Sequence, residues 1–452
     1  MTAQSPTESD RSSASTDGAV PPGPDGYPVL GNTVDIMRRP LAFLDELRTY
    51  GDVVRYDLLG DTVTALLHPD HVERVLVEEP ERFERYLFAE QGFDFAPEGI
   101  LFTNGEQWRH QRRLFQSGFT MDRIRSYADT MSAYAAEAAA EWEDGQEVVL
   151  NDRFSTLTLR ILAAALFDVE VDPDGEDEAI VSAARIINER SDSNSYAAVV
   201  PNWVPTPGNR RYKRALEEYR RRVDTLIERR RGEGDDLLSI LLDADDDLSE
   251  AELRDNLITF TFAGHETSSL ALTYTVLLLA QHEEIRAALD AELDAVLDGE
   301  RPRFEHVPRL ERTERVLTEA MRLYPPAYIM FRTPTEDVRL DGYELPEGSI
   351  VTLPQYAIHR DERFYDDPGA FRPDRWTDDA DRPEYAYFPF GGGPRHCIGM
   401  RFAMLELKLV LATLAQRFEF EVLSDPDPEL NPGATLQPAA DVRVRVHERA
   451  DR

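Results

Sequence analysis

The chain has 452 residues, and 42% of them are hydrophobic, so a large apolar core is possible. It carries 86 Asp and Glu against 50 Lys and Arg, and the net charge of −36 excludes nucleic acid and anionic lipid as favourable partners. The single cysteine excludes an intramolecular disulfide framework and favours a cytoplasmic protein. We interpret the acidity as typical of a salt-accumulating halophile, the alternative being an ordinary acidic protein.

The chain begins with a polar segment. Residues 1–20 are rich in Ser, Thr and Asp and contain no apolar run, so we predict a disordered tail without a signal peptide. The rest of the chain, residues 21–452, is predicted to be one domain. Near its start, the patterns at 52–56 and 62–67 predict a short β-hairpin.

Helical periodicity dominates the sequence after this hairpin. The segments predicted to be helices are 105–115, 124–142, 154–167, 210–231, 250–281, 283–297, 309–323 and 400–418. Short β segments are expected at 337–354 and in a C-terminal hairpin, where residues 442–446 alternate. We therefore predict a mainly α fold with minor β, built as a single large helical domain with small β-sheets.

The only cysteine lies in segment 390–399 (FGGGPRHCIG), directly before a predicted helix. Glycines make a tight loop possible, and the N-terminus of a helix favours a thiolate. Arg395 adds a positive charge near the sulfur, and Gly399 leaves room for a large flat group. The alternatives are a buried structural cysteine, a zinc ligand and a protease nucleophile. Zinc is disfavoured because no second cysteine is present, whereas one motif does not exclude the protease.

Segment 390–399 resembles the haem-binding signature of the cytochrome P450 family, Phe-x-x-Gly-x-Arg-x-Cys-x-Gly, at every specified position. The resemblance implies the cytochrome P450 fold, haem b as cofactor and Cys397 as the axial ligand of the haem iron. It also implies that Phe390, Gly391 and Gly399 line the cofactor site and that Arg395 contacts a haem propionate.

A second motif, AGHETS at residues 263–268, lies in the middle of the predicted helix 250–281. A local opening of this helix at Gly264 could admit water and a ligand. The alternative is a kinked structural helix in which Thr267 bonds back to a carbonyl. The motif resembles the oxygen-activation segment of the same family. That resemblance implies that Thr267 holds dioxygen and a water, and that Glu266 supplies protons.

The apolar run at 257–280 is nearly long enough to span a bilayer. His265 and Glu266 at its centre would be costly in lipid, so we predict a buried helix and no transmembrane segment. His265 and His396 flank the two motifs at variable positions of the family patterns. We therefore interpret both histidines as packing or hydrogen-bonding residues.

The pair Glu319 and Arg322 has a spacing that recurs elsewhere in the chain and usually indicates a surface ion pair. The resemblance implies instead that these two residues join Arg375 in a buried triad. The triad would support the cysteine loop, so loss of Arg322 is expected to abolish haem incorporation.

Trp108 and Arg112 are four residues apart on one predicted helix face and could together bind a carboxylate. A solvated basic helix is the alternative. The resemblance assigns Trp108, Arg112 and Arg332 to the haem propionates. A further basic segment at 210–231 is either a solvated helix face or a docking patch for an acidic partner or a membrane surface.

The resemblance implies a haem-thiolate monooxygenase that inserts one oxygen atom from O2 into an apolar substrate, a hydroxylation-type oxidation. The sequence contains no flavin or ferredoxin signature, so electrons are expected from separate proteins of the ferredoxin and reductase type. The alternatives are a peroxide-driven peroxygenase or isomerase, which the intact Glu266–Thr267 pair disfavours, and a non-enzymatic haem sensor or electron carrier. The residues expected to line the substrate pocket are Phe260, Phe262, Ala263, Ala327, Tyr328 and Ile329.

Overall fold

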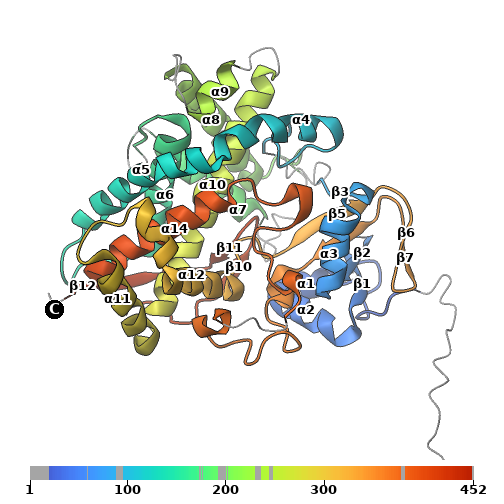
Figure 1. The fold of residues 1–452 in the computed structure, drawn as a ribbon. Coiled ribbons are helices and arrows are strands. Elements are labelled where there is room, and N and C mark those ends of the chain that lie inside the picture. The colour runs from blue at the N-terminus through green and yellow to red at the C-terminus, as the bar shows by residue number, and fades with distance from the viewer. Residues whose placement is uncertain are drawn as a thin grey trace, which may run out of the picture.

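The computed structural model describes residues 20–58, 60–87, 95–172, 175, 177–191, 200, 202–229, 236–243, 248–377 and 382–449. Helices make up most of this structure, and the largest sheet lies at one side of it, at the right of Figure 1. The predicted mainly α fold with small sheets is therefore confirmed. The predicted tail lies outside the described residues up to position 19.

Every helix predicted from the sequence is present. These helices are α4 (Gly105–Gln116), α5 (Met121–Ala140), α6 (Leu150–Phe167), α8 (Pro207–Arg229), α10 (Glu250–Leu279), α11 (Glu283–Leu297), α12 (Glu311–Leu323) and α14 (Met400–Arg417). The helices that the prediction missed are α1 (Thr33–Arg38), α2 (Pro40–Leu47), α3 (Pro69–Glu73), α7 (Glu178–Ser191), α9 (Leu237–Asp243) and α13 (Gln355–Ile358). Most of the missed helices are too short to show a clear period in sequence.

Helix α10 is the central element of the core. Ser249 caps its N-terminus in a reciprocal capping box with Glu252. The helix runs without interruption to Leu279, so the local opening expected near Gly264 is not found. A Cβ at Gly264 would overlap the side chain of Leu162 on α6, so the glycine instead allows the two helices to pack closely.

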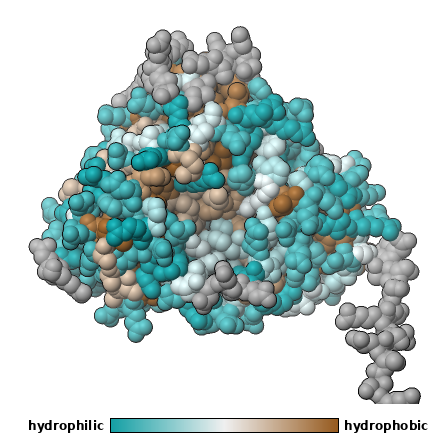
Figure 2. All heavy atoms as spheres, in the orientation of Figure 1, coloured by the Kyte–Doolittle hydropathy of each residue, from teal (hydrophilic) through white to brown (hydrophobic). Residues whose placement is uncertain are grey.

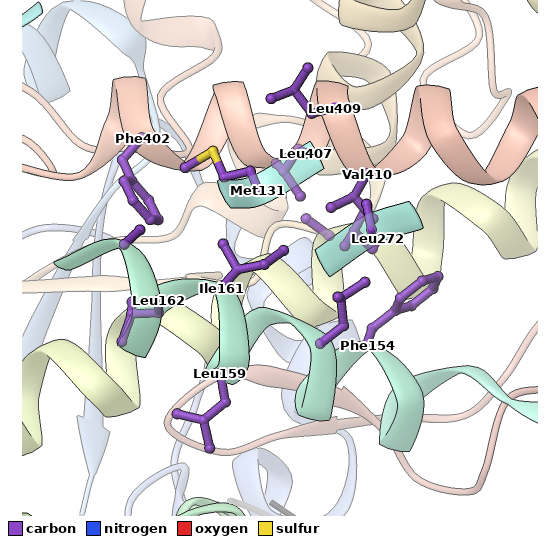
Figure 3. Close-up of a cluster of buried hydrophobic side chains, with 14 of the residues drawn as sticks. Met131, Phe154, Leu159, Ile161, Leu162, Leu272, Phe402, Leu407, Leu409 and Val410 are labelled. Atoms are coloured by element: carbon purple, nitrogen blue, oxygen red, sulfur yellow. The ribbon is translucent and has the colours of Figure 1, made fainter. Parts of the chain in front are cut away.

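The core lies where four helices meet. Met131 of α5, Leu162 of α6, Leu272 of α10 and the pair Phe402 and Leu407 of α14 belong to one cluster of buried side chains (Figure 3). Burial of such side chains contributes roughly 1.5–3 kcal/mol each and is the main stabilising term. The loop that carries Cys397 leads directly into α14, so this core holds the C-terminal side of the loop rigid.

The strands form four small sheets. The largest has the order β1-β2-β8-β5-β3. Its strands are β1 (Val53–Leu58), β2 (Asp61–Leu66), β3 (Phe83–Arg85), β5 (Met330–Pro334) and β8 (Ile350–Leu353). The hairpin predicted near residue 60 is confirmed, because β1 and β2 pair antiparallel. Strands β3 and β5 also pair antiparallel, which sets Arg85 opposite Arg332.

The smaller sheets include a hairpin of β6 (Val338–Leu340) and β7 (Tyr343–Leu345), as expected for a β segment with turns. The prediction for the C-terminus was partly wrong. Strand β12 (Arg443–Glu448) pairs with β9 (Phe418–Val422) and with β4 (Glu147–Val149) and does not form a hairpin of its own. The C-terminal hairpin consists of β10 (Leu430–Pro432) and β11 (Leu436–Pro438).

Polar side chains cover most of the face in Figure 2, and the apolar ones that show gather near its centre. Among the described helices, none combines the length and the apolar run that a membrane crossing needs. Helix α8 carries exposed cations, although Arg211 pairs with Glu189 at 2.6 Å and Arg221 pairs with Glu218. The end of the predicted basic segment, residues 230–231, lies outside the described residues.

Candidate functional site

The cysteine loop is held by its own backbone and by a close contact with a distant segment. The N–H of Cys397 donates to the carbonyl of Phe390 at 2.8 Å. Gly393 has a φ of 61°, and a Cβ there would overlap the carbonyl oxygen of Leu76. A side chain at position 393 would therefore be strained and would collide with backbone, so this turn requires glycine.

Cys397 is accessible at its surface, yet the surrounding protein raises the pKa of its thiol through burial. The side chain therefore lines a recess and not the outer surface. The N–H of Gly399 and the charge of Arg112 oppose the rise in pKa without reversing it. The start of the helix therefore favours the thiolate, as expected, but does not outweigh burial, and a metal cation at the sulfur would provide the missing stabilisation.

The space beside the cysteine is bordered by a glycine that the protein does not crowd. The nearest side chain to a Cβ built at Gly399 is Phe119, whose Cε1 would be 3.7 Å away. Gly391 has a φ of 71°, and its Cβ would meet Met330. Gly391 therefore allows the backbone conformation of the turn, whereas Gly399 leaves room for a neighbouring group.

Four arginines, Arg85, Arg112, Arg332 and Arg395, surround this recess. Burial lowers the pKa of Arg332 to about 9 and the pKa values of Arg85 and Arg395 to about 10. Repulsion from Arg85 adds to the effect at both Arg332 and Arg395. Burial also lowers the pKa of Arg112. In the described part of the chain, no carboxylate forms an ion pair with any of the four. Such a cluster in a protein of charge −36 indicates a binding site for an anionic group.

Helix α4 and the cysteine loop are joined through these arginines. The guanidinium carbon of Arg395 lies 4.1 Å from the centre of the Trp108 ring, and its Nη2 donates to Asn104 Oδ1 at 2.8 Å. Arg112 Nη1 donates to the carbonyl of His396 at 3.0 Å. The structure thus brings Trp108, Arg112 and Arg395 together, and the resemblance implied a shared role for these three residues.

Two members of this cluster were missed in the sequence. Asn104 binds both the N–H and the carbonyl of Arg85, at 3.2 and 3.0 Å, while its Oδ1 also accepts from Arg395. The position of Arg85 follows from its pairing with Arg332 across β3 and β5. That pairing joins segments far apart in the chain, so local sequence patterns contain no signal for it.

Glu319, Arg322 and Arg375 form a buried network. Glu319 accepts from Arg322 at 2.8 and 2.9 Å, from Arg375 at 2.8 Å and from the Trp376 indole at 2.9 Å. The N–H of Arg372 also donates to it at 3.0 Å. Burial raises the pKa of Glu319, but these donors outweigh it and the net pKa is lowered. The network therefore contains its own counter-charge.

The motif on α10 places its acid and its hydroxyl in different surroundings. Thr267 Oγ1 donates to the carbonyl of Ala263 at 2.7 Å, the back-bonded arrangement considered from the sequence. Glu266 is buried, and its Oε1 accepts from Asn188 of α7 at 3.1 Å and from Gln437 of β11 at 2.5 Å. The carboxylate therefore contacts α7 and the β10–β11 hairpin and not the Thr267 hydroxyl.

The two histidines beside the motifs have the structural roles expected of them. His265 is buried and its Nδ1 contacts the carbonyl of Thr261. The Nδ1 of His396 lies 2.8 Å from the carbonyl of Gly393, within the cysteine loop.

Two of the residues predicted to line the substrate pocket pack among aromatic side chains. Phe260 packs against Phe115 and Phe119 in the core, with ring centres 5.1 and 6.0 Å away, and Phe262 packs against Phe95 at 4.8 Å. Aromatic residues on α10 thus stabilise its packing.

The remaining lining candidates differ in exposure. Tyr328 is buried, and its hydroxyl donates to the carbonyl of Gly433 at 3.2 Å. Ala263 and Ile329 are half-buried, while Ala327 is exposed. A separate cavity of ≈ 350 Å³ lies between α5 and α6, and none of the predicted site residues lines it.

Comparison with known proteins agrees with this geometry. The family model described as Cytochrome P450 matches residues 21–444. The chain belongs to the cytochrome P450 family. It is 34% identical over 424 residues to cyclooctat-9-en-7-ol 5-monooxygenase of Streptomyces melanosporofaciens, covering 91% of this chain and 90% of that protein. It is 33% identical over 437 residues to pentalenene oxygenase of Streptomyces avermitilis, covering 94% and 97%.

Membership in this family makes the protein a cytochrome P450 monooxygenase with haem b as its cofactor. The residues present fit that group. Haem b carries two carboxylates and an iron that accepts a thiolate, and the recess offers unpaired guanidinium groups beside the one cysteine.

Proposed function

We propose that this cytochrome P450 hydroxylates an apolar molecule with O2, using Cys397 as the thiolate ligand of haem b. The observation that carries the proposal is the accessible cysteine beside a buried Arg332 and half-buried Arg85 and Arg395, none of which forms an ion pair with a described carboxylate. The bound haem supplies the oxidising chemistry, and the protein supplies orientation, protons and exclusion of water.

The side chains around the recess have separate roles in this proposal. Arg332 and Arg395 hold the propionates, together with Arg112 and Trp108. Arg85 is added to this set because it shares the same buried charge cluster. Phe390, Gly391 and Gly399 shape the wall beside the sulfur.

The supply of protons is assigned to Thr267 and Glu266 of α10. The Thr267 hydroxyl is half-buried and bonded to its own helix, so it can turn toward a ligand at the cost of one hydrogen bond, about 1 kcal/mol. Glu266 is held by Asn188 and Gln437. Transfer from Glu266 to Thr267 therefore requires a bridging water or a rotation of the carboxylate.

The substrate is proposed to be a cyclic alkene or an alcohol derived from one. This proposal rests on the names of the two relatives, which contain an alkene, pentalenene, and an unsaturated alcohol, cyclooctat-9-en-7-ol. Small accessible residues support it, since Ala263 and Ala327 leave more room than the buried Phe260 and Phe262.

Electrons are proposed to come from separate proteins of the ferredoxin and reductase type. Exposed cations near the cysteine loop, including Arg113 and Arg401, would suit an acidic electron donor. In a salt-rich cytoplasm such docking would need apolar contacts as well. The halophilic origin, the cytoplasmic location and a docking role for segment 210–231 remain predictions.

The test measures product, hydrogen peroxide and O2 consumption with a cyclic alkene, for the parent protein and for Thr267→Ala. We expect the variant to keep its haem spectrum and O2 uptake while most of the O2 is released as hydrogen peroxide. Ser269→Ala is the control, because the Ser269 hydroxyl likewise donates to a backbone carbonyl of the same helix, that of Glu266. Peroxide-driven product formation that Thr267→Ala leaves unchanged would instead support a peroxygenase.

A further inference from the structure

The segment before the cysteine loop is attached to the core through one buried histidine. His359 directly follows α13 and has no exposed surface. Its Nε2 accepts the N–H of Phe388 at 3.0 Å. Gln355 donates from its side chain to the carbonyl of the same Phe388. Two side chains, Gln355 of α13 and His359 directly after it, thus fix both backbone groups of Phe388.

The other side of His359 is joined to the buried network of Glu319. Arg322 Nη1 donates to the carbonyl of His359 at 2.8 Å, while its other nitrogens bind Glu319. The guanidinium of Arg322 also lies over the ring of Tyr365, whose hydroxyl donates to Ala386 at 2.8 Å. The position of Arg322 therefore determines where His359 and the segment near Phe388 lie.

From Phe388 the connection continues to the cysteine. The N–H of Gly391 donates to the carbonyl of Phe388 at 2.9 Å, and the N–H of Cys397 donates to the carbonyl of Phe390 at 2.8 Å. A displacement of Phe388 would change the start of this loop and with it the direction of the Cys397 side chain.

We propose that the neutral imidazole of His359 is the positioning group that transmits the fixed location of Arg322 to the cysteine loop. The inference deepens the proposed thiolate role of Cys397 and rests on it. The chemistry requires the neutral form, because the N–H of Phe388 is a donor and Nε2 must offer a lone pair to it. A protonated ring would present a second donor to the same N–H and break the link.

The surroundings keep His359 neutral. Burial lowers its pKa well below the ordinary 6.5, and the charges of Arg322 and Arg360 lower it further. The ring also contacts Tyr387, whose pKa is raised by burial and which stays uncharged. Because the folded form binds the proton less readily than the unfolded chain, this contribution to stability is complete above pH 6.5. It is lost as the pH falls from there through the folded pKa.

The first test is an acid titration of the holoprotein, read by the absorption of the reduced carbon monoxide complex that reports thiolate ligation. His359→Gln keeps an acceptor for Phe388 but does not titrate, so we expect its loss of the thiolate signal to move to lower pH than in the parent. The matched control is His282→Gln, which removes a half-buried histidine bonded to Leu278 on another helix. It should titrate like the parent. Identical acid profiles for the parent and His359→Gln would overturn the proposal.

The second test is hydrogen exchange of the amides of Phe388 and Cys397 in the holoprotein at neutral pH. His359→Leu removes the acceptor, and we expect both amides to exchange about tenfold faster or more. Amides in the middle of α14 should remain protected, and His359→Gln should restore slow exchange. Unchanged exchange in His359→Leu would contradict the proposal. If His359→Leu does not fold, the titration of His359→Gln decides alone.

The titration and the exchange measurement also show whether the role of His359 or the role of Cys397 has failed. A parent protein without any thiolate signal would contradict the role of Cys397. The exchange at Phe388 would still report whether His359 holds the loop.

Discussion

Two clusters of buried or half-buried arginines in the described part of the chain differ in one respect. Arg322 and Arg375 share the carboxylate of Glu319, which accepts hydrogen bonds from five N–H groups in all. Arg85, Arg332 and Arg395 have no carboxylate within ion-pairing distance in the described part of the chain, and burial lowers the pKa of each. The first cluster contains a carboxylate partner of its own, and the second contains none among the described residues.

This difference separates a scaffold from a binding site. Buried charges are costly, and a protein tolerates them when an internal partner or a ligand compensates them. In the cluster of Glu319 the compensation is internal, so removal of a member should destabilise the fold itself. In the cluster of Arg332 the compensation must come from a bound anion, so removal of a member should weaken binding more than folding.

The largest effect is expected for Arg322→Leu. It leaves Glu319 buried with its main partner missing, which costs about 3–5 kcal/mol in the free energy of unfolding. Holoprotein should not form, as judged by urea unfolding and by haem content after purification. The control is Arg109→Leu, since Arg109 pairs with Glu106 at the same spacing on an exposed helix face and should cost under about 1 kcal/mol. Equal effects of the two variants would remove the distinction between scaffold and surface pair.

Arg332→Gln should show opposite effects on folding and on binding. The apoprotein should become more stable, because a buried unpaired charge is removed. Haem affinity should fall by about 1.5–3 kcal/mol, the value of a hydrogen bond to a charged group. Urea unfolding of the apoprotein and haem transfer to a competing haem-binding protein measure the two quantities. A loss of apoprotein stability would mean that Arg332 supports the fold itself, as Arg322 does.

Glu406→Gln extends the comparison to an acid. Glu406 lies on α14, neither of its oxygens has a hydrogen-bond partner of normal length, and burial raises its pKa to about 8, with Ser268 opposing the rise. Glu406 keeps its proton to a higher pH in the folded protein than in the unfolded chain. The free energy of unfolding therefore falls as the pH rises from 4.5 to about 8. The variant should gain about 1–3 kcal/mol over the parent across this range. Urea unfolding at several pH values measures the gain, and a gain independent of pH would contradict the prediction.

The smallest effect is expected for Asn104→Ala. Its amide joins the backbone of Arg85 to the guanidinium of Arg395. Loss of these bonds should cost about 1 kcal/mol in holoprotein stability and increase the mobility of Arg395. Thermal unfolding of the holoprotein measures the change. Asn151→Ala is a control, since Asn151 bonds to the N–H of Val442 far from the recess.

Sequence patterns predicted the long helices and the cysteine loop because these depend on local periodicity and on a short run of residues. They also brought Trp108, Arg112 and Arg395 to one site through a family motif. Arg85 and Asn104 were missed because their roles depend on the pairing of β3 with β5 and on the meeting of α4 with the loop. The packing of Phe260 against Phe115 and Phe119 was not predicted, because periodicity does not tell which side chains a buried helix face meets.

The contact between Gly393 and Leu76 has a consequence for biosynthesis. The ribosome produces the segment of Leu76 early and the cysteine loop only near the end of translation. The carbonyl of Leu76 is therefore made long before Gly393, its contact in the loop, is added to the chain. A nascent chain that is released before position 393 lacks the loop, and one that has lost its first eighty residues lacks the backbone of Leu76 against which Gly393 packs. Segments from both the early and the late part of the chain must therefore be present before this contact can form.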